Sequence, residues 1–133
     1  MNNGTIDLQR NGFIATLVIN RPAKLNALTP EMLEQLLAHC HTLETDSEIR
    51  VVLLTSASEK AFCVGADIHR WTSLSALDMW RNWIRRGHQA FDALAQVWNW
   101  LLPPISVFVA PKHKWHYQKP GWRQCLAGQE RSG

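Results

Sequence analysis

The sequence predicts a single α/β domain, and three observations support this fold class. Two short apolar runs at residues 14–19 and 51–55 are typical of buried strands, and a helical pattern separates them. A strand, a helix and a strand in this order favour a right-handed crossover with parallel pairing. A longer helical pattern then leads to another β-branched run at 105–110. The length of 133 residues suits one domain with a real core and is short for two.

The chain opens with the pattern of a β-hairpin. Residues 6–10 and 14–19 are the expected strands, and Asn11-Gly12 between them is a pair that tolerates positive φ in a tight turn. The second of these strands is almost wholly apolar. It is therefore expected to be covered on both faces.

The first helix is expected to begin at Thr29-Pro30-Glu31. Thr29 can cap the helix, Pro30 has its φ preset for the first helical position, and the Glu31 carboxylate complements the positive end of the helix dipole. We expect the helix to end near residues 44–46. Its apolar residues recur at helical spacing and form one stripe: Met32, Leu33, Leu36, Leu37, Cys40 and Leu43.

The second helical pattern covers roughly residues 75–102. Gly87 interrupts it and is expected to weaken it by about 1 kcal/mol relative to alanine, and Pro103-Pro104 ends it. We interpret the large apolar residues on one side of this helix, several of them tryptophans, as packing residues. They are Leu77, Trp80, Ile84, Phe91, Leu94, Trp98 and Leu101.

Charge divides the chain into two regions. Residues 1–107 hold nine basic and ten acidic side chains, whereas residues 108–133 hold five basic and one acidic. We therefore expect a domain at 1–107 and a basic, poorly ordered tail at 108–133. The nearly balanced domain predicts no nucleic-acid partner, and a nucleic-acid contact through the tail is a minor alternative. No apolar run approaches the ~20 residues of a membrane helix and no secretory signal is visible, which predicts a cytoplasmic protein.

No metal site and no cofactor are predicted. Cys40, Cys63 and Cys125 lie far apart and form no CxxC pair, so we interpret them as ordinary thiols. His39 and His41 are two residues apart and do not face each other on a helix.

The segment Ala61-Phe62-Cys63-Val64-Gly65-Ala66-Asp67-Ile68 is the candidate for chemistry. It follows a predicted buried strand, and its glycine permits a turn that other residues resist. The backbone N–H groups of Ala66 and Asp67 would then be free, and such groups stabilise negative charge that develops on an oxygen. The alternative is an ordinary loop in which Asp67 is a cap.

Three blocks in order resemble the N-terminal part of the enoyl-CoA hydratase/isomerase (crotonase) family. They are Ile19-Asn20-Arg21-Pro22-Ala23-Lys24-Leu25-Asn26-Ala27-Leu28, Val51-Val52-Leu53-Leu54-Thr55 and Lys60-Ala61-Phe62-Cys63-Val64-Gly65-Ala66-Asp67-Ile68. The resemblance covers about residues 5–107, roughly the first third of a usual member. It implies a truncated form of the family's β-β-α spiral, with a sheet edge and apolar helix faces left uncovered.

The resemblance also implies a substrate and a set of site residues. Lys24 and Leu25 match the positions where the family folds its backbone around coenzyme A. The acyl-thioester and adenine site matches Cys63, Ala66, Asp67 and Ile68. The N–H of Ala66 matches one of two oxyanion-hole donors that polarise the thioester carbonyl. The implied substrate is an acyl-CoA, with hydration of a trans-2-enoyl thioester as the default reaction and coenzyme A as part of the substrate.

The sequence departs from the family after the fourth strand. The family takes its second oxyanion donor from a glycine-rich turn there, whereas this chain has Ala110-Pro111-Lys112. Hydratases of the family use two later glutamates, but only Glu130 follows residue 107 here, and the helices of the family's homo-oligomer are not recognisable. We therefore expect an incomplete, inactive enzyme. The alternative is a non-catalytic remnant that binds coenzyme A weakly or assembles with relatives.

Overall fold

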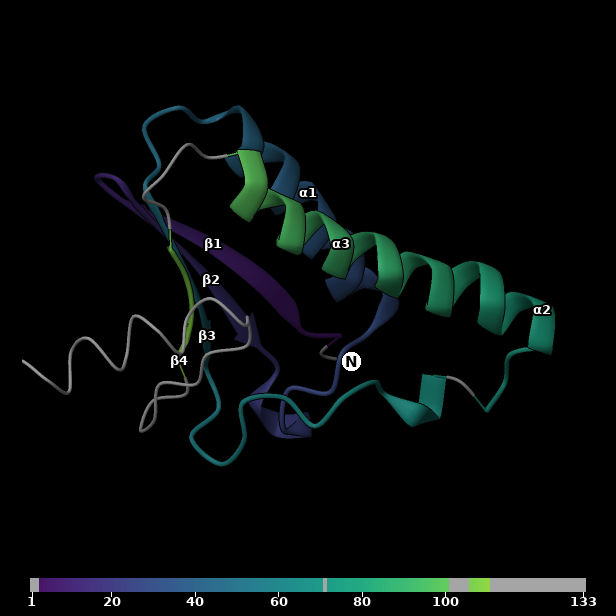
Figure 1. Ribbon diagram of the computed structural model, residues 1–133. Helices are drawn as coiled ribbons and strands as arrows, with labels where there is room; N and C mark the ends of the chain where they lie inside the picture. The colour runs from purple at the N-terminus through teal and green to yellow at the C-terminus, as the bar shows by residue number, and fades with distance from the viewer. Residues whose placement is uncertain (1–2, 71, 101–105, 111–133) are drawn as a thin grey trace, which may run out of the picture.

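One four-stranded sheet with helices over one of its faces forms the body of the protein (Figure 1). The computed structural model describes residues 3–70, 72–100 and 106–110. The strands lie in the order β1 (Thr5–Asn11), β2 (Ile14–Asn20), β3 (Val51–Ser56) and β4 (Ser106–Ala110). The helices are α1 (Pro30–Thr45), α2 (Ala76–Asp78) and α3 (Arg85–Trp100), and a π-helical segment at Met79–Ile84 joins α2 to α3.

The opening hairpin forms with its turn one residue later than predicted. The antiparallel register of β1 and β2 ends at the pair Asn11 and Ile14, so Gly12 and Phe13 make the turn rather than Asn11 and Gly12. Gly12 has φ +59°, whereas Asn11 and Phe13 do not have positive φ. Positive φ at the first central residue alone is the pattern of a type II′ turn, which needs glycine there.

The predicted parallel pairing is confirmed. β2 pairs with β3 through Ala15 and Val52, and β3 pairs with β4 through Val52 and Val107. β4 continues to Ala110 and so crosses the point at which the composition of the chain changes. Of the tail expected at 108–133, residues 108–110 belong to β4, and residues 111–133 lie outside the described residues.

Strand β2 is buried on one face only, which corrects the expectation of two covered faces. Ala15, Leu17 and Ile19 are buried, whereas the residues between them are half-buried. The helices that the structure describes lie on one side of the sheet (Figure 1), so alternate residues of β2 reach the core.

Helix α1 forms where the sequence predicted, and its side chains hydrogen-bond to the backbone of the edge strand β1. The Thr29 hydroxyl accepts a hydrogen bond from the Met32 N–H at 3.2 Å, and the predicted apolar stripe is buried except for the partly buried Leu37. The Gln35 side chain accepts from the Ile6 N–H at 2.7 Å, and the His39 ring bonds the Ile6 carbonyl at 2.7 Å. These two side chains occupy backbone groups of an edge strand that would otherwise be free to pair.

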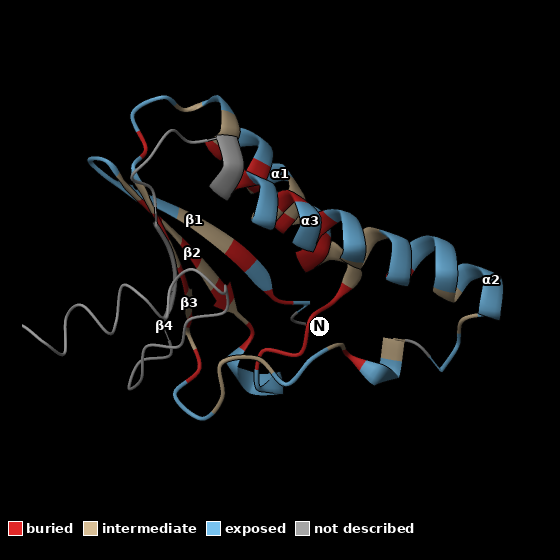
Figure 2. Cartoon of the chain, viewed as in Figure 1, coloured by how far each residue is buried: buried red, intermediate tan, exposed pale blue. Residues whose placement is uncertain are grey.

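The helix that runs from α2 to α3 packs on a different side from the one predicted. Leu77, Trp80, Ile84 and Phe91 were expected to pack, but they are 53%, 57%, 38% and 50% exposed. The buried side consists of Trp83, Ala90, Ala93 and Val97, with Leu94 partly buried. Figure 2 shows most of this helix in the pale blue of exposed residues. Small alanines let α3 approach α1 closely, which larger side chains prevent. Of the other predicted positions, the Trp98 side chain and Leu101 lie outside the described part.

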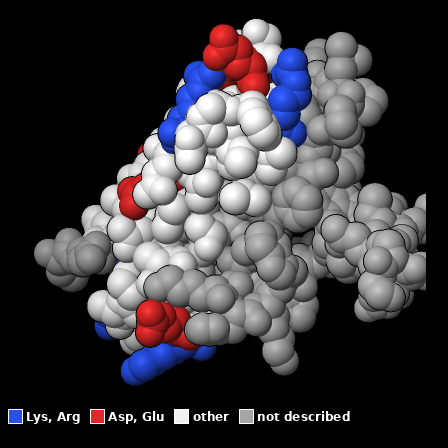
Figure 3. Space-filling model, turned by 90° about the vertical axis from the view of Figure 1, so that its left-hand side faces the viewer, with Lys and Arg blue, Asp and Glu red and all other residues white. Residues whose placement is uncertain are grey.

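On the face that Figure 3 shows, most of the charged side chains lie at the upper and lower ends, and the surface between them is largely uncharged. None of the helices within the described residues is long and apolar enough to cross a membrane.

Candidate functional site

Two loops meet at one edge of the sheet because they follow the carboxyl ends of the parallel strands β2 and β3. The first loop leads from β2 to α1, and the second contains the candidate segment at residues 61–68. An isolated parallel bridge between Leu28 and Ala66 joins them. The Leu28 N–H donates to the Gly65 carbonyl at 2.8 Å, and the Asp67 N–H donates to the Leu28 carbonyl at 2.9 Å.

This bridge determines the direction of the Ala66 amide. In a parallel ladder, the residue between two bonded neighbours turns its own N–H and C=O to the opposite side. The Ala66 N–H therefore points away from Leu28, and no hydrogen bond joins it to another residue in the part of the chain that the structure describes. Gly65 has φ +100°, a conformation that favours glycine and that permits this bend.

A small open pocket lies beside Ala66. Its volume is about 280 Å³. The residues that line it come from both loops: Lys24, Ala27, Val64, Ala66, Asp67, Ile68 and His69. The pocket thus combines apolar side chains with an exposed lysine and a backbone donor, the mixture typical of small-molecule sites.

A buried ion pair clamps the second loop against the first. The Arg21 Nη1 donates to the Asp67 Oδ2 at 2.7 Å and to the Ala27 carbonyl at 3.0 Å. Both charged side chains are more than nine-tenths buried. The hydrogen bond from Arg21 holds the pKa of Asp67 below its usual value, with help from the His69 N–H and against burial, which raises it. Asp67 is therefore an ionised structural anchor and not a proton acceptor poised near neutral pH.

Asn26 completes the connection between the loops. Its Oδ1 accepts from the Arg21 N–H at 2.8 Å, and its Nδ2 donates to the Ser56 hydroxyl at 2.7 Å and to the Phe62 carbonyl at 3.0 Å. Asn26 is fully buried and has φ +59°, following Leu25 at φ +51°. Asparagine tolerates this left-handed conformation better than most residues, and its amide serves both loops.

Four of the six predicted site residues line this pocket. Lys24, Ala66, Asp67 and Ile68 surround it, whereas Leu25 and Cys63 are not among its lining residues. Cys63 instead accepts a hydrogen bond through its sulfur from the Gly65 N–H at 3.4 Å, and burial raises the pKa of its thiol. Burial also raises the pKa of Cys40 to about 12, as expected of a core thiol.

Sequence reasoning missed Arg21 as a partner of Asp67, and it missed the pocket residues Ala27, Val64 and His69. Arg21 and Asp67 are 46 positions apart, and no local pattern connects them. The available signal was that both stand in the blocks that carry the family resemblance. Among the described residues, no group of three His, Cys, Asp or Glu side chains is placed to hold a metal ion.

Comparisons with known proteins show the family of the chain. The family model "Enoyl-CoA hydratase/isomerase" matches residues 14–99. The short-chain-enoyl-CoA hydratase of Clostridium acetobutylicum is 36% identical over 78 residues, which are 59% of this chain and 30% of that protein. The mitochondrial 3-hydroxyisobutyryl-CoA hydrolase of Bos taurus is 39% identical over 61 residues, which are 46% of this chain and 16% of that protein.

A solved structure gives the same result for the fold. The enoyl-CoA hydratase of Mycobacterium smegmatis superposes with a TM-score of 0.66 and 27% identity, covering 77% of this chain and 38% of that one. The chain thus matches less than half the length of each of these relatives. Because the family model matches well over half of its residues and the fold agrees, the chain belongs to the enoyl-CoA hydratase/isomerase family.

Proposed function

We propose that the chain binds an acyl-CoA thioester in the pocket between the two loops, with the thioester carbonyl oxygen at the Ala66 N–H. One observation carries this proposal. The Ala66 amide has no hydrogen-bond partner among the described residues, although the backbone groups on both sides of it are fixed to Leu28. A donor held rigidly and left open to a pocket requires no reorganisation when negative charge develops on an oxygen beside it.

The charges around the pocket support an anionic ligand. Lys24 is exposed at the pocket, and the phosphates of coenzyme A are anions that an ammonium group attracts. The carboxylate of Asp67 also borders the pocket, but its charge is compensated by Arg21 at 2.7 Å. The ion pair therefore anchors the loop without repelling a negatively charged ligand.

The reaction of the family requires more than this half of the site. A trans-2-enoyl thioester is hydrated when its enolate is stabilised by two donors and carboxylates activate water. At the place of the second donor this chain has Ala110-Pro111, and proline has no N–H. Since losing one oxyanion donor costs about 10²–10³-fold in rate, we expect binding by the 133-residue cytoplasmic chain without measurable hydration.

Calorimetric titration with crotonyl-CoA tests the binding. We expect saturable binding that Lys24→Ala weakens about tenfold, the effect of losing about 1.4 kcal/mol. Lys60→Ala is the matched control, because it removes the same charge from an exposed loop residue that does not line the pocket. Absence of binding, or equal loss in both variants, would contradict the proposal.

A hydration assay tests the catalytic half of the proposal. Loss of the enoyl-thioester absorbance is followed at high protein concentration, with heat-denatured protein as the blank. We expect a rate equal to the blank. Turnover that heating abolishes would show that this chain supplies the missing donor and carboxylates itself.

A further inference from the structure

Gly4 lies just before the first strand, and its backbone contacts the side chain of Arg21 directly. Strand β1 pairs with β2 through Thr5 and Asn20, so the next positions outward, Gly4 and Arg21, face each other across the hairpin. Gly4 is buried, and Arg21 is 6% exposed. A Cβ atom on Gly4 would lie 2.7 Å from the Arg21 Cβ and 2.8 Å from its Cγ and Cδ. Carbon atoms in good contact are about 3.5–4.0 Å apart, so a side chain does not fit at residue 4.

This approach is closer than that of an ordinary strand pair. Opposite residues in an antiparallel pair hold their Cβ atoms about 4.5–5.5 Å apart. Here three carbons of the Arg21 side chain lie against Gly4, and the guanidinium reaches the Asp67 carboxylate at 2.7 Å. Gly4 has φ +77°, a conformation that favours glycine. Both the backbone angle and the lack of a side chain at Gly4 therefore serve the contact with Arg21.

The backbone of Arg21 is fixed as well. Its carbonyl accepts from the Lys24 N–H at 3.1 Å and from the Asn26 N–H at 3.0 Å, and its N–H donates to the Asn26 Oδ1 at 2.8 Å. Rotation of the side chain cannot relieve a contact with Cβ, because this atom is bonded to the fixed backbone. A methyl group at residue 4 would therefore displace either the Gly4 backbone or the arginine.

The residue before Gly4 holds the other end of the same loop. The Thr29 hydroxyl donates to the Asn3 carbonyl at 3.0 Å, and it also caps helix α1. Asn3 and Gly4 thus contact the loop from β2 to α1 at its start, through Arg21, and at its end, through Thr29. Between these two points lies Leu28, which forms the bridge to Ala66.

We propose that Gly4 is a positioning residue for the acyl-CoA site, an inference that rests on the function proposed above. Gly4 does not line the pocket, so it acts through Arg21. It confines the arginine side chain to the direction that meets Asp67. The Asp67 N–H in turn bonds the Leu28 carbonyl at 2.9 Å, which fixes the peptide next to the Ala66 donor. Groups that are held in place by their neighbours in this way keep a site in its productive geometry.

Gly4→Ala tests the proposal, with Gly12→Ala as the matched control. Both variants place alanine at a positive φ, +77° and +59°, but a Cβ on Gly12 meets nothing within 4 Å. Since a small misplacement of a positioned group costs up to about 10²-fold, we expect Gly4→Ala to weaken crotonyl-CoA binding about tenfold. Gly12→Ala should bind like the parent chain. Equal affinities in the two variants would overturn the proposal.

The absorbance of bound crotonyl-CoA separates positioning from a loss of stability. A hydrogen bond to the thioester carbonyl polarises the conjugated enoyl group and shifts its absorbance to longer wavelength. At saturating ligand, we expect a smaller shift in Gly4→Ala than in the parent chain or in Gly12→Ala. A full shift in Gly4→Ala would show that Gly4 serves stability alone and would overturn the proposal.

A measurement without ligand distinguishes failure of this inference from failure of the proposed function. A parent chain that does not bind crotonyl-CoA would contradict the proposed function. The effect of Gly4 on the ion pair is followed separately, by NMR titration of the Asp67 carboxyl. We expect the pKa of Asp67 to rise toward its ordinary value in Gly4→Ala, because its hydrogen bond from Arg21 is weakened. An unchanged pKa would overturn the inference.

Asp67→Asn provides a test that leaves residue 4 unchanged, in case Gly4→Ala does not fold. It neutralises the partner of Arg21 and nearly conserves the shape of the side chain. If Gly4 and the ion pair hold each other in place, the Gly4 amide should exchange with solvent faster in Asp67→Asn, relative to the core amides of β2. Equal relative exchange in the two proteins would overturn the proposal.

Discussion

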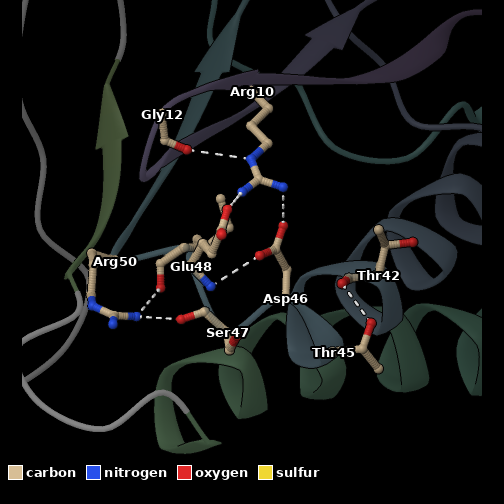
Figure 4. A network of polar contacts seen from close by, with 9 residues as sticks. Arg10, Gly12, Thr42, Thr45, Asp46, Ser47, Glu48 and Arg50 are labelled. Carbon is tan, nitrogen blue, oxygen red and sulfur yellow. Dashed lines mark hydrogen bonds and ion pairs between the residues drawn. The ribbon is translucent and has the colours of Figure 1, made fainter.

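Four arginines pair with carboxylates among the described residues, and two of them, Arg21 and Arg10, lie in sharply different surroundings. Arg21 meets Asp67 inside the fold, where the side chains are 7% and 9% exposed. Arg10 bonds Asp46 at 2.5 Å and Glu48 at 2.6 Å near the hairpin turn (Figure 4). There the Arg10 side chain is 46% exposed and that of Glu48 is 79% exposed.

The comparison shows that the number of ion pairs an arginine forms says little about how much they contribute to the free energy of unfolding. Arg10 has more charged partners, but water screens each of them and competes for the same groups. Arg21 pairs with Asp67 inside the fold, and removing either member leaves the other charge buried without this partner. Of the two arginines, Arg21 is the one that connects the loops bordering the pocket, so both the stability and the geometry of the site depend on it.

Replacing Arg21 by methionine should have the largest effect. The substitution keeps an unbranched apolar chain in contact with Gly4 but leaves the Asp67 carboxylate buried without its partner. We expect a loss of about 3–5 kcal/mol in the free energy of unfolding, measured by urea denaturation. A loss below that of Arg10→Met would break the comparison.

Asn26→Ala should be the next most damaging change. It removes one hydrogen bond within the first loop and the two that link this loop to Ser56 and Phe62, and it places alanine at φ +59°. We expect a loss of about 2–3 kcal/mol in the free energy of unfolding. Asn26→Gly removes the same hydrogen bonds but accepts the positive φ, so it should recover part of the loss. Equal losses in the two variants would show that backbone strain contributes nothing here.

The elements of the fold could be predicted from local patterns, and the reason is visible in Thr29. Capping, the proline at the first helical position and an apolar stripe all act within a few residues, and the helix forms as predicted. The hairpin turn was placed one residue early because Asn11-Gly12 is a good turn pair by itself, whereas the register with Ile14 determines which residues turn. The register of two strands depends on contacts along their whole length, whereas a turn preference depends only on the residues of the turn.

The face of the long helix could not be predicted from the size of its side chains. Leu77, Trp80, Ile84 and Phe91 are exposed, whereas the smaller Ala90, Ala93 and Val97 are buried together with Trp83. When a helix has two apolar sides, its sequence alone does not show which side is buried. That depends on which side packs against the neighbouring helix. The ion pair between Arg21 and Asp67 could not be predicted for a similar reason, because these residues come together only after the sheet has formed. Asp67 as a cap was a partial success, because its Oδ1 does accept from the His69 N–H at 3.1 Å.

Lowering the pH should reduce the contribution of the buried Arg21–Asp67 pair to the free energy of unfolding. We expect this effect to be smaller than that of Arg21→Met or Asn26→Ala. The pKa of Asp67 is lowered in the folded protein by the Arg21 hydrogen bond, so the unfolded chain takes up the proton first. The stability that this pair contributes is therefore fully present above the ordinary pKa of aspartate, near 4, and is lost as the pH falls through the folded value below it. Unfolding free energies measured from neutral pH to pH 3 should fall less in Asp67→Asn than in the parent protein. Parallel curves would contradict the assignment.

Arg10→Met should have the smallest effect and should sharpen the comparison through its response to salt. Exposed pairs contribute about 0–1 kcal/mol, and salt screens them. We expect a small loss in the free energy of unfolding that shrinks further when the ionic strength is raised. The much larger loss in Arg21→Met should change little under the same conditions, because buried charges are screened far less. If salt instead reduced both losses equally, Arg21 and Asp67 would have to be accessible to ions, and the clamp between the loops would be open in solution.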